Sequence, residues 1–484
     1  MPIITQTDLL SSRRTKIVAT LGPSSKDPET IKQLITAGVD VFRLNLSHGT
    51  HDDHRAAYER VRSLSVQLNK PVAVLADLCG PKIRTGQFRS SPIELKKGDT
   101  VTVTTRDVLG EPGLIPSQYK AMIRDVRPGN SIFLDDGKIL LRTESTDGQD
   151  AICTVIQGGL LHDNKGINLP GVDVSAQSFT EKDRIDAKFA MELGIDFLAL
   201  SFVRSGADIL DLRALIHECG HDVPIVAKIE KAEALKHSTE ILEAADAIMV
   251  ARGDLGVELS PEEVPIAQQK LIEKAVSFNK PVIVATQMLE SMTNSRRPSR
   301  AEVTDVSFAV TGGVDAVMLS AETSVGAYPT EAVEMMVRII LLTESFMWKQ
   351  RPVVVLRKNA NQHRPVAFGD AVANATAQLS YDLLVKAILI ITRSGMSAAT
   401  ISSARPAAPV IAVAPTERIR RRMNLYWGVI PAVAEDVGSV NPNVLARRVA
   451  LRTGLAKKGD YVLLVRGFNS DPALNTPTIT LLAI

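Results

Sequence analysis

Eight short apolar runs alternate with longer amphipathic stretches over roughly the first 345 residues of this 484-residue chain. This alternation predicts βα units whose strands share one parallel sheet. Because there are eight units and no Gly-x-Gly-x-x-Gly motif follows the first run, the pattern favours a closed (β/α)8 TIM barrel; a doubly wound open sheet is the alternative. The runs lie at 16–22, 41–47, 72–78, 197–202, 224–230, 247–253, 281–287 and 316–322.

The interval between the third and fourth runs is too long for an ordinary βα loop. Gly, Pro and Asp break it into short β-type stretches, at 93–105, 127–145 and 150–161. Such stretches are typical of a small all-β domain. We therefore expect a small β-barrel-like domain inserted as a lid over 86–176, which leaves 1–85 and 177–348 to the barrel.

Helices are expected after most of the apolar runs, for example at 27–37, 181–193, 260–278 and 330–342. The third of these helices is predicted to start at a capping hydroxyl on Ser260, with Pro261 at the first helical position. Glu263 follows three residues after the cap, which completes a capping box.

A second apolar pattern starts near residue 350, with runs at 387–392, 410–415, 429–434, 461–467 and 478–484. Helix-like stretches separate most of these runs, so the pattern predicts a further α/β domain over 349–484. The segment 351–370 is flanked by prolines and polar in its middle, and we interpret it as the linker between the two parts.

Charge and cysteine content narrow the classes of partner and compartment. The chain has 56 Lys and Arg against 54 Asp and Glu, a formal charge of +2, which gives no general attraction to nucleic acid or to an anionic membrane. No apolar run reaches the ~20 residues that cross a bilayer. Three dispersed cysteines exclude a disulfide framework and favour a reducing compartment. We expect a cytoplasmic protein without a secretory signal.

Polar side chains interrupt the apolar runs near their carboxyl ends, where barrel enzymes place their chemistry. The fifth run carries Lys228 and Glu230, two residues apart and therefore on the same side of a strand. The sixth run is followed by Asp254. Two carboxylates from neighbouring strands, with water and a phosphorylated substrate, suit Mg²⁺. Taken alone, Lys228 and Glu230 are equally compatible with a structural ion pair, and Asp254 with a turn.

Other strand ends carry polar groups as well, and only the first is interpreted as lacking them. Arg43, Asn45 and Ser47 share one side of the second strand, and an arginine fork with amide and hydroxyl groups suits phosphate oxygens or a nucleotide. Each such residue alone is compatible with a structural role. The recurrence at seven of eight strand ends favours function. The remaining candidates are His48, the stretch Asp77–Arg84, Thr286, Gln287, Ser320 and Glu322.

These residues lie in segments that closely resemble the pyruvate kinase family. The segments include TKIVATLGPSS (15–25), FRLNLSHG (42–49), GPKIRTG (80–86), AKIE (227–230), MVARGDLGVE (249–258), ATQMLESM (285–292) and MLSAETSVGAYP (318–329). The resemblance implies a barrel, a mobile inserted β-domain, a C-terminal regulatory α/β domain and a homotetramer. It implies transfer of a phosphoryl group from phosphoenolpyruvate to ADP, which yields pyruvate and ATP in glycolysis.

The resemblance also implies roles for single residues. Lys228 would stabilise charge on the transferring phosphoryl group and the enolate oxygen. Glu230 and Asp254 would hold Mg²⁺ or Mn²⁺. The amides of Gly253 and Asp254, with Thr286, would bind the substrate carboxylate, and Arg43 would contact the substrate phosphate. Ser320 and Thr286 would support protonation of the enolate carbon. The residues implied to contact the nucleotide are Asn45, Leu46, Ser47, His48, Arg84 and Lys165.

Two departures concern a monovalent cation. Many family members bind K⁺ through the positions of Asn45, Ser47, Asp77 and the carbonyl group of Leu78. Those members usually have Glu where this chain has Lys82, and Thr at the position of Leu78. A tethered ammonium can replace a diffusible cation, so we expect that this enzyme does not require K⁺; the alternative is that Lys82 is an ordinary solvated lysine.

In the C-terminal domain, the family's corresponding loop binds an effector phosphate, often of a sugar phosphate. Small polar residues and backbone amides at a helix start suit an anion, although a plain helix start is the alternative. The residues implied are Thr392, Arg393, Ser394, Gly395 and Ser397.

Two other functions of the whole protein stay open: a metal-dependent lyase or aldolase that acts without nucleotide, and a non-catalytic sugar-phosphate sensor.

Overall fold

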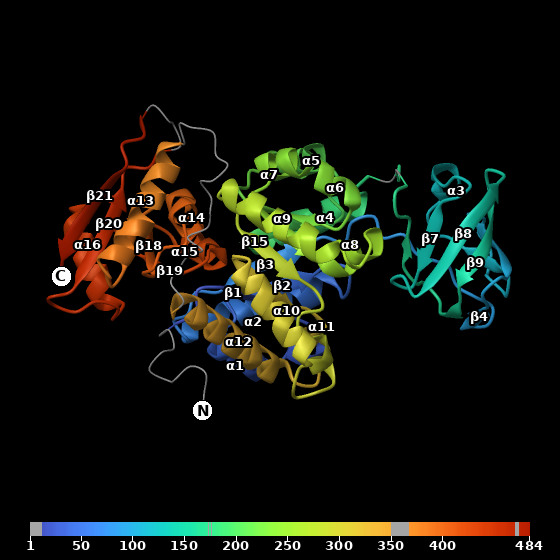
Figure 1. The fold of residues 1–484 in the computed structure, drawn as a ribbon, viewed down its shortest axis with the longest axis horizontal. Helices are drawn as coiled ribbons and strands as arrows, with labels where there is room; N and C mark the ends of the chain where they lie inside the picture. The colour runs from blue at the N-terminus through green and yellow to red at the C-terminus, as the bar shows by residue number, and fades with distance from the viewer. Residues whose placement is uncertain (1–11, 173, 176, 350–366, 470–473) are drawn as a thin grey trace.

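The computed structural model describes residues 12–172, 174–175, 177–349, 367–469 and 474–484 (Figure 1). Most of the predicted linker, 351–366, lies outside the described residues. The expected closed barrel is confirmed: eight parallel strands close in the order β1-β16-β15-β14-β13-β12-β3-β2. The strands are β1 (Lys16–Thr20), β2 (Val41–Asn45), β3 (Ala73–Asp77), β12 (Phe197–Leu200), β13 (Ile225–Ile229), β14 (Ala247–Ala251), β15 (Val282–Ala285) and β16 (Ala316–Leu319).

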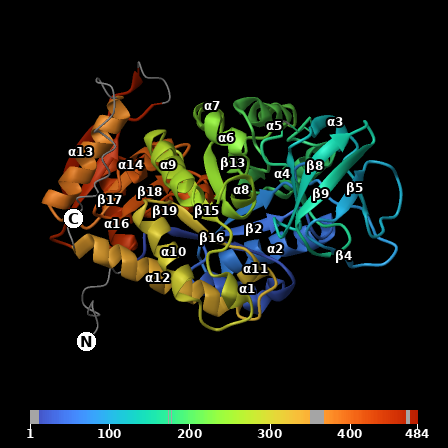
Figure 2. The ribbon, with the colours of Figure 1, turned by 45° about the vertical axis from the view of Figure 1, so that its right-hand side comes forward.

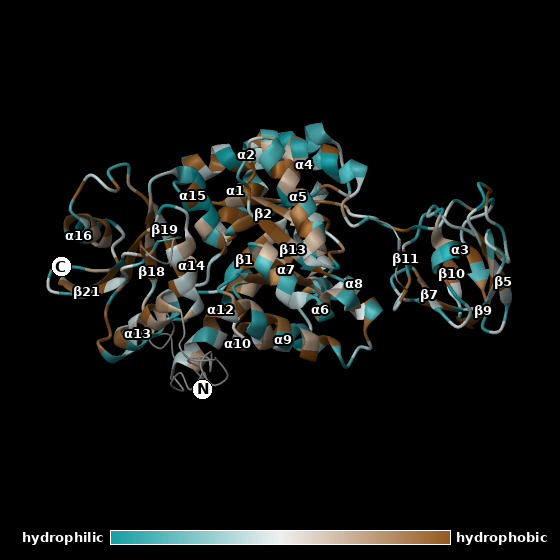
Figure 3. Cartoon of the chain, turned by 90° about the horizontal axis from the view of Figure 1, so that it is seen from above, coloured by the Kyte–Doolittle hydropathy of each residue, from teal (hydrophilic) through white to brown (hydrophobic). Residues whose placement is uncertain are grey.

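The barrel strands are apolar on both sides because the interior and the surrounding helices both exclude water. Val18, Leu75 and Met249 belong to the interior cluster, whereas Ile17 and Val250 pack in the larger cluster under the helices. Figure 3 shows these strands in brown beneath helices that are partly teal on the outside. The principal helices are α1 (Pro28–Ala37), α2 (His51–Gln67), α4 (Glu181–Leu193), α5 (Gly206–Glu218), α9 (Val264–Ser277), α10 (Arg300–Thr311) and α12 (Pro329–Lys349). Shorter helices follow other strands: α6 (Ala232–Lys236), α7 (Ser238–Ala244), α8 (Arg252–Glu258) and α11 (Ala321–Ser324).

The predicted start of α9 is wrong. The amide and hydroxyl of Ser260 do donate to the Glu263 carboxylate, at 3.1 and 2.8 Å, but the helix begins at Val264. A helix that began at Pro261 would need the amide of residue 265 to donate to the Pro261 carbonyl. Residue 265 is itself a proline and has no N–H group, so the α-helical hydrogen bonds begin one turn later.

The inserted domain forms a separate body beside the barrel and has its own apolar core (Figures 1 and 2). It contains a six-stranded sheet in the order β11-β7-β8-β9-β5-β6 and a two-stranded sheet formed by β10 and β4. Its boundaries at 86 and 176 stay a prediction. Its elements are β4 (Ile93–Leu95), β5 (Thr100–Thr104), β6 (Leu114–Pro116), α3 (Met122–Asp125), β7 (Ser131–Leu134), β8 (Ile139–Thr146), β9 (Asp150–Gln157), β10 (Gly159–Leu161) and β11 (Ile167–Asn168).

The C-terminal α/β domain lies on the opposite side of the barrel from the inserted domain (Figure 1). Its sheet has the order β19-β18-β17-β20-β21, parallel except for β21. Leu425 of this domain is buried in the barrel's interior cluster, and Arg421 pairs with Asp196 at 3.0 Å. The elements are α13 (Phe368–Asp382), β17 (Ile388–Ile391), α14 (Met396–Ser403), β18 (Val410–Ala414), α15 (Glu417–Arg422), β19 (Val429–Val433), α16 (Pro442–Arg452), β20 (Tyr461–Arg466) and β21 (Thr478–Ala483).

The three cysteines are free thiols, as expected. Burial raises the pKa of the Cys153 thiol to about 11. Within the described part of the chain, every helix is too short or too polar to cross a bilayer.

Candidate active site

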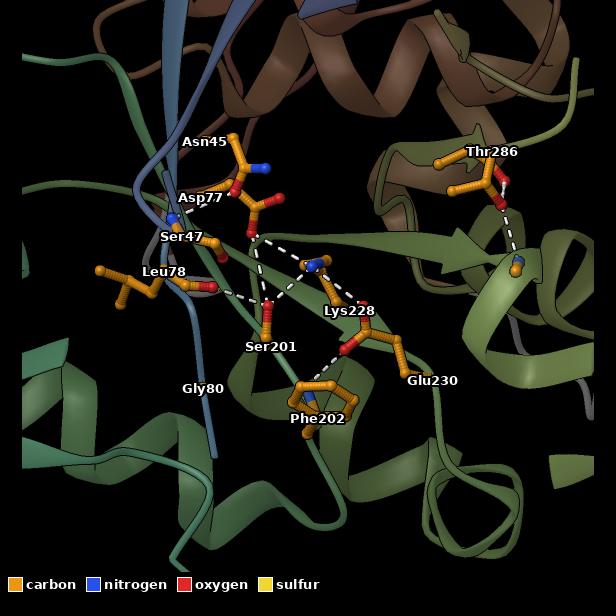
Figure 4. Close-up of polar contacts among 12 residues, drawn as sticks. Asn45, Ser47, Asp77, Leu78, Gly80, Ser201, Phe202, Lys228, Glu230 and Thr286 are labelled. Carbon is orange, nitrogen blue, oxygen red and sulfur yellow. Dashed lines mark hydrogen bonds and ion pairs between the residues drawn. The ribbon is translucent and has the colours of Figure 1, made fainter. Parts of the chain in front are cut away.

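The predicted lysine and its carboxylate partner meet at the carboxyl ends of the barrel strands (Figure 4). The ammonium group of Lys228, on β13, lies 2.9 Å from Glu230 Oε1. It lies 3.2 Å from Oδ1 of Asp77, which ends β3. All three side chains are almost fully buried. A buried ammonium group held by two carboxylates is fixed in position and charge.

These charges determine one another's protonation. Burial alone would lower the pKa of Lys228, but the carboxylates of Asp77 and Glu230 raise it above its ordinary value. Burial opposes ionisation of Asp77, yet the charges of Lys228 and Arg43 bring its pKa below the ordinary value. At neutral pH the site therefore contains a protonated amine beside an ionised aspartate.

Ser201 is part of this cluster, although no role was predicted for it from the sequence. It accepts a hydrogen bond of 2.6 Å from the Lys228 ammonium group and donates one of 2.7 Å to the Leu78 carbonyl oxygen. The next residue, Phe202, donates its amide to Glu230 Oε2 at 2.7 Å. The end of β12 thus orients both members of the Lys228–Glu230 pair.

Arg43 reaches the same cluster from β2. Its Nε donates to Asp77 Oδ2 at 2.6 Å, and another guanidinium nitrogen donates to the hydroxyl of Thr20 at 3.1 Å. Thr20 is the last residue of β1. The expectation that the first strand end lacks a polar group is therefore wrong. The Thr20 hydroxyl faces Arg43, so the first strand end also carries a polar side chain directed at the site.

Asp254 and Glu230 supply the two carboxylates expected for a divalent cation, from the ends of β14 and β13. Burial raises the pKa of Glu230, and the negative charge of Asp254 raises it further. A cation bound beside these two carboxylates would favour the ionised form of Glu230. The described residues contain no group of three or more acidic, histidine or cysteine side chains that could hold a metal ion.

Thr286 follows β15 and has a left-handed backbone, with φ of 68°, which is unusual for a β-branched residue. Its hydroxyl accepts the Gly253 amide at 2.8 Å and donates to the Ala285 carbonyl at 2.6 Å. A substrate carboxylate at the Gly253 amide would replace the first of these bonds. Arg252, to which the sequence analysis assigned no role, donates to the Thr286 carbonyl at 2.7 Å and pairs with Asp305 at 2.5 Å. Arg252 therefore holds the strained residue in place.

At the end of β16, the hydroxyl of Ser320 is buried and has no hydrogen-bond partner among the described residues. The Ser320 amide donates to Glu322 Oε2 at 2.7 Å, and the Leu289 amide donates to Oε1 at 3.0 Å. Burial raises the pKa of Glu322. An unpartnered buried hydroxyl is free to bind a water molecule or a substrate atom.

A cleft with about 600 Å³ of empty space separates the barrel mouth from the inserted domain and is lined by Asp254, Lys82 and Gly166, among others. Lys165 of the inserted domain pairs with Asp135 at 2.8 Å, and Arg84 donates to the Asn164 carbonyl at 2.9 Å. Both cations thus bind residues of the inserted domain.

The loop after β2 carries the other residues expected to contact the nucleotide. The Ser47 amide donates to Asn45 Oδ1 at 3.2 Å. Leu46 is buried and His48 is exposed. Burial, and after it the charge of Lys82, lowers the pKa of His48. Lys82 therefore acts electrostatically on this loop.

Three of the four residues named for a K⁺ pocket already use their oxygen atoms in hydrogen bonds or ion pairs within the described part of the chain. Asn45 accepts the Ser47 amide, Asp77 binds Arg43 and Lys228, and the Leu78 carbonyl accepts Ser201. Within the part of the chain that the structure describes, the exposed Lys82 side chain makes no ion pair.

The expected effector loop lies apart from this cluster, in the C-terminal domain between β17 and α14. Thr392 Oγ1 accepts the Gly395 amide at 2.9 Å, and Gly395 has φ of 94°, a conformation that favours glycine. Arg393 and Ser394 are exposed. The loop is folded as a tight turn that leads directly into the helix.

Comparison with known proteins shows which family the chain belongs to. The family model "Pyruvate kinase, barrel domain" matches residues 12–333, and "Pyruvate kinase, alpha/beta domain" matches residues 370–481. Pyruvate kinase 2 of Synechocystis sp. is 43% identical over 96% of this chain and 78% of its own length. The pyruvate kinase of Mycobacterium intracellulare is 43% identical over 94% and 95%. The crystal structure of a pyruvate kinase from Cryptosporidium parvum superposes with a TM-score of 0.92 at 34% identity, covering 99% of this chain and 97% of that one.

Fold, site and relatives together define a phosphotransferase built on a (β/α)8 barrel with an inserted domain and a C-terminal α/β domain. The family models match most of the chain, and the relatives align along almost all of it. The chain belongs to the pyruvate kinase family.

Proposed function

We propose that the chain transfers the phosphoryl group of phosphoenolpyruvate to ADP and so forms pyruvate and ATP, as a step of glycolysis. The observation that carries this proposal is the buried Lys228 ammonium group, which lies 2.9 Å from Glu230 at the mouth of the barrel. Phosphoryl transfer requires little covalent chemistry of the protein and depends on positioning and charge neutralisation. A fixed cation beside two carboxylates supplies both.

The residues of the chain divide this task between them. Arg43 would bind the substrate phosphate, and Lys228 would stabilise negative charge on the phosphoryl group and the enolate oxygen. Glu230 and Asp254 would hold Mg²⁺ or Mn²⁺, which when bound neutralises charge on the substrate carboxylate and phosphate. Arg84 and Lys165 would face the nucleotide, and exclusion of water from the closed cleft would limit hydrolysis.

The two alternative functions lack the support that the phosphotransferase has. A lyase or aldolase does not need nucleotide-facing cations across the cleft, and a sensor does not need a buried lysine beside two carboxylates. A steady-state assay of ATP formation from phosphoenolpyruvate and ADP with Mg²⁺ separates all three. Pyruvate release without ATP would support the lyase, and absence of turnover would support the sensor.

Glu230→Gln is expected to weaken divalent-cation binding. Removal of an outer-shell partner alone typically lowers metal affinity by roughly 10- to 100-fold, so the loss of a direct carboxylate ligand should raise the half-saturating Mg²⁺ concentration at least about tenfold. Glu258→Gln is the matched control, because Glu258 is also buried and pairs with a lysine, Lys231, at 2.6 Å. An equal shift in both variants, or none in Glu230→Gln, would contradict the assignment.

Regulation by a phosphorylated metabolite at the loop of Thr392, Arg393, Ser394, Gly395 and Ser397 is part of the proposal. Ser394→Asp places a negative charge where the effector phosphate would lie, so activation by any sugar phosphate in a panel should fall at least about tenfold. Activity without effector should stay unchanged. Activation that survives in this variant would place the effector elsewhere.

Three further points stay predictions: independence of K⁺ through Lys82, a homotetramer, and a cytoplasmic location. The support for the first is that the Lys82 charge acts on His48 beside the cleft.

A further inference from the structure

The inserted domain is attached to the barrel by two connections, one leaving β3 and one entering α4. The outgoing connection joins the inserted domain early: the Thr85 amide donates to the Lys165 carbonyl at 2.8 Å, and the Ile167 amide donates to the Ile83 carbonyl at 2.9 Å. Within the part of the chain that the structure describes, Gly80 is the last residue of that connection with a hydrogen bond to the barrel. Only Pro81 and Lys82 therefore lie between the part held by the barrel and the part held by the inserted domain.

One carboxylate binds both connections. Asp183 Oδ1 accepts the Gly80 amide at 3.0 Å. Its Oδ2 accepts the amide of Thr180 at 3.0 Å and the Thr180 hydroxyl at 2.6 Å. Asp183 is fully buried, and Thr180 is the last residue before α4 on the return connection. The two ends of the inserted domain are thus joined at a single side chain.

The backbone of Gly80 is closely packed, which fixes the direction of its amide towards Asp183. Gly80 has φ of +67°, and a Cβ atom there would lie 2.8 Å from a ring carbon of Phe202 and 3.0 Å from Ser201 Cβ. The backbone is therefore pressed against the end of β12, with its amide directed at Asp183. An asparagine at 183 has one acceptor oxygen and could satisfy the outgoing or the return connection, but not both.

We propose that Asp183 is a positioning residue, which fixes the two connections to each other and so sets where the inserted domain stands over the barrel mouth. This inference rests on the proposed function, because Arg84 and Lys165 lie beyond the outgoing connection and face the nucleotide. We call Asp183 and its hydrogen bonds to Gly80 and Thr180 the clasp. Arg43 and Lys228 belong to the barrel, so their positions do not depend on the clasp. Loss of the clasp should therefore weaken binding of ADP more than binding of phosphoenolpyruvate.

Asp183→Asn tests the proposal. Loss of a buried hydrogen bond to a charged group changes an equilibrium constant by roughly tenfold. We therefore expect KM for ADP to rise about tenfold. KM for phosphoenolpyruvate and kcat should stay within about twofold. Hydrogen exchange of the Gly80 and Thr180 amides should be faster. Glu302→Gln is the control: Glu302 also caps its own helix through Ser299 and binds a preceding loop through Ser291, but among the described residues no hydrogen bond joins it to the inserted domain.

The outcomes separate the proposals. Unchanged KM for ADP with unchanged exchange would overturn the clasp, as would an equal fall in kcat in both variants without a change in KM. If the native enzyme made no ATP, the proposed function would fail, while faster exchange in Asp183→Asn would still support the clasp. Should Asp183→Asn not fold, Thr180→Val removes only the Thr180 hydroxyl, which donates to Asp183 Oδ2 and accepts the Asp183 amide, and keeps the carboxylate in place. It should raise KM for ADP about two- to threefold, and an unchanged KM would again overturn the proposal.

Discussion

Lys228→Ala should lower kcat by roughly 10²-fold or more, the scale for the loss of one electrostatic stabiliser of a transition state. The variant should still fold. Asp77 would retain Arg43 as a partner, and Glu230 would retain the Phe202 amide at 2.7 Å, so neither carboxylate would be left without a partner. The measurement is steady-state ATP formation, with circular dichroism to show that the fold is kept.

The matched control is Lys16→Ala. Lys16 is also a buried lysine on a barrel strand, with a side chain 9% exposed against 11% for Lys228. It lies at the start of β1, where it donates to the Val429 carbonyl at 2.7 Å. Its loss should reduce stability and leave kcat nearly unchanged. Near-normal turnover in Lys228→Ala, or an equal loss of kcat in the control, would remove Lys228 from the catalytic role.

The second large effect concerns the monovalent cation. With tetramethylammonium as the only monovalent cation, the native enzyme should keep its rate within about twofold, because Lys82 supplies the positive charge beside the cleft. Lys82→Glu should lose at least about tenfold under the same conditions, since the interaction of unit charges near a protein surface is worth a few kcal/mol. Addition of K⁺ should restore the activity of this variant.

Lys96→Glu is the control for charge reversal, because Lys96 is an exposed lysine of the inserted domain, with a side chain 70% exposed. It should show no dependence on K⁺. Collapse of the native rate in tetramethylammonium would show that a diffusible cation is required. A Lys82→Glu enzyme that does not respond to K⁺ would show that Lys82 is a solvated lysine.

Much of the architecture could be predicted because the barrel repeats one local pattern. Each strand is a short, nearly continuous apolar run, and the carboxyl ends of parallel strands meet at one edge, so Lys228 and Glu230 could be placed together without coordinates. Helix boundaries were less predictable. At α9, two prolines four residues apart decide where the hydrogen-bonded turns begin, and the capping pattern at Ser260 does not reveal this.

For other residues of the site, a local pattern does not reveal their partners. Ser201 lies in an apolar run and is recognised only because Lys228 and Leu78 approach it from other strands. Asp183 reads as a member of an ordinary Thr-x-x-Asp cap, and its second oxygen binds Gly80, 103 residues earlier in the chain. Contacts of this range depend on barrel closure, which a local pattern does not encode.

The most direct test of the proposed activity is the ratio of ATP to pyruvate formed by the purified native enzyme from phosphoenolpyruvate, ADP and Mg²⁺. A cluster that positions and neutralises a transferring phosphoryl group should give one ATP for each pyruvate, with no pyruvate formed when ADP is left out. Pyruvate released without ATP, or no turnover in the presence of both substrates, would contradict it.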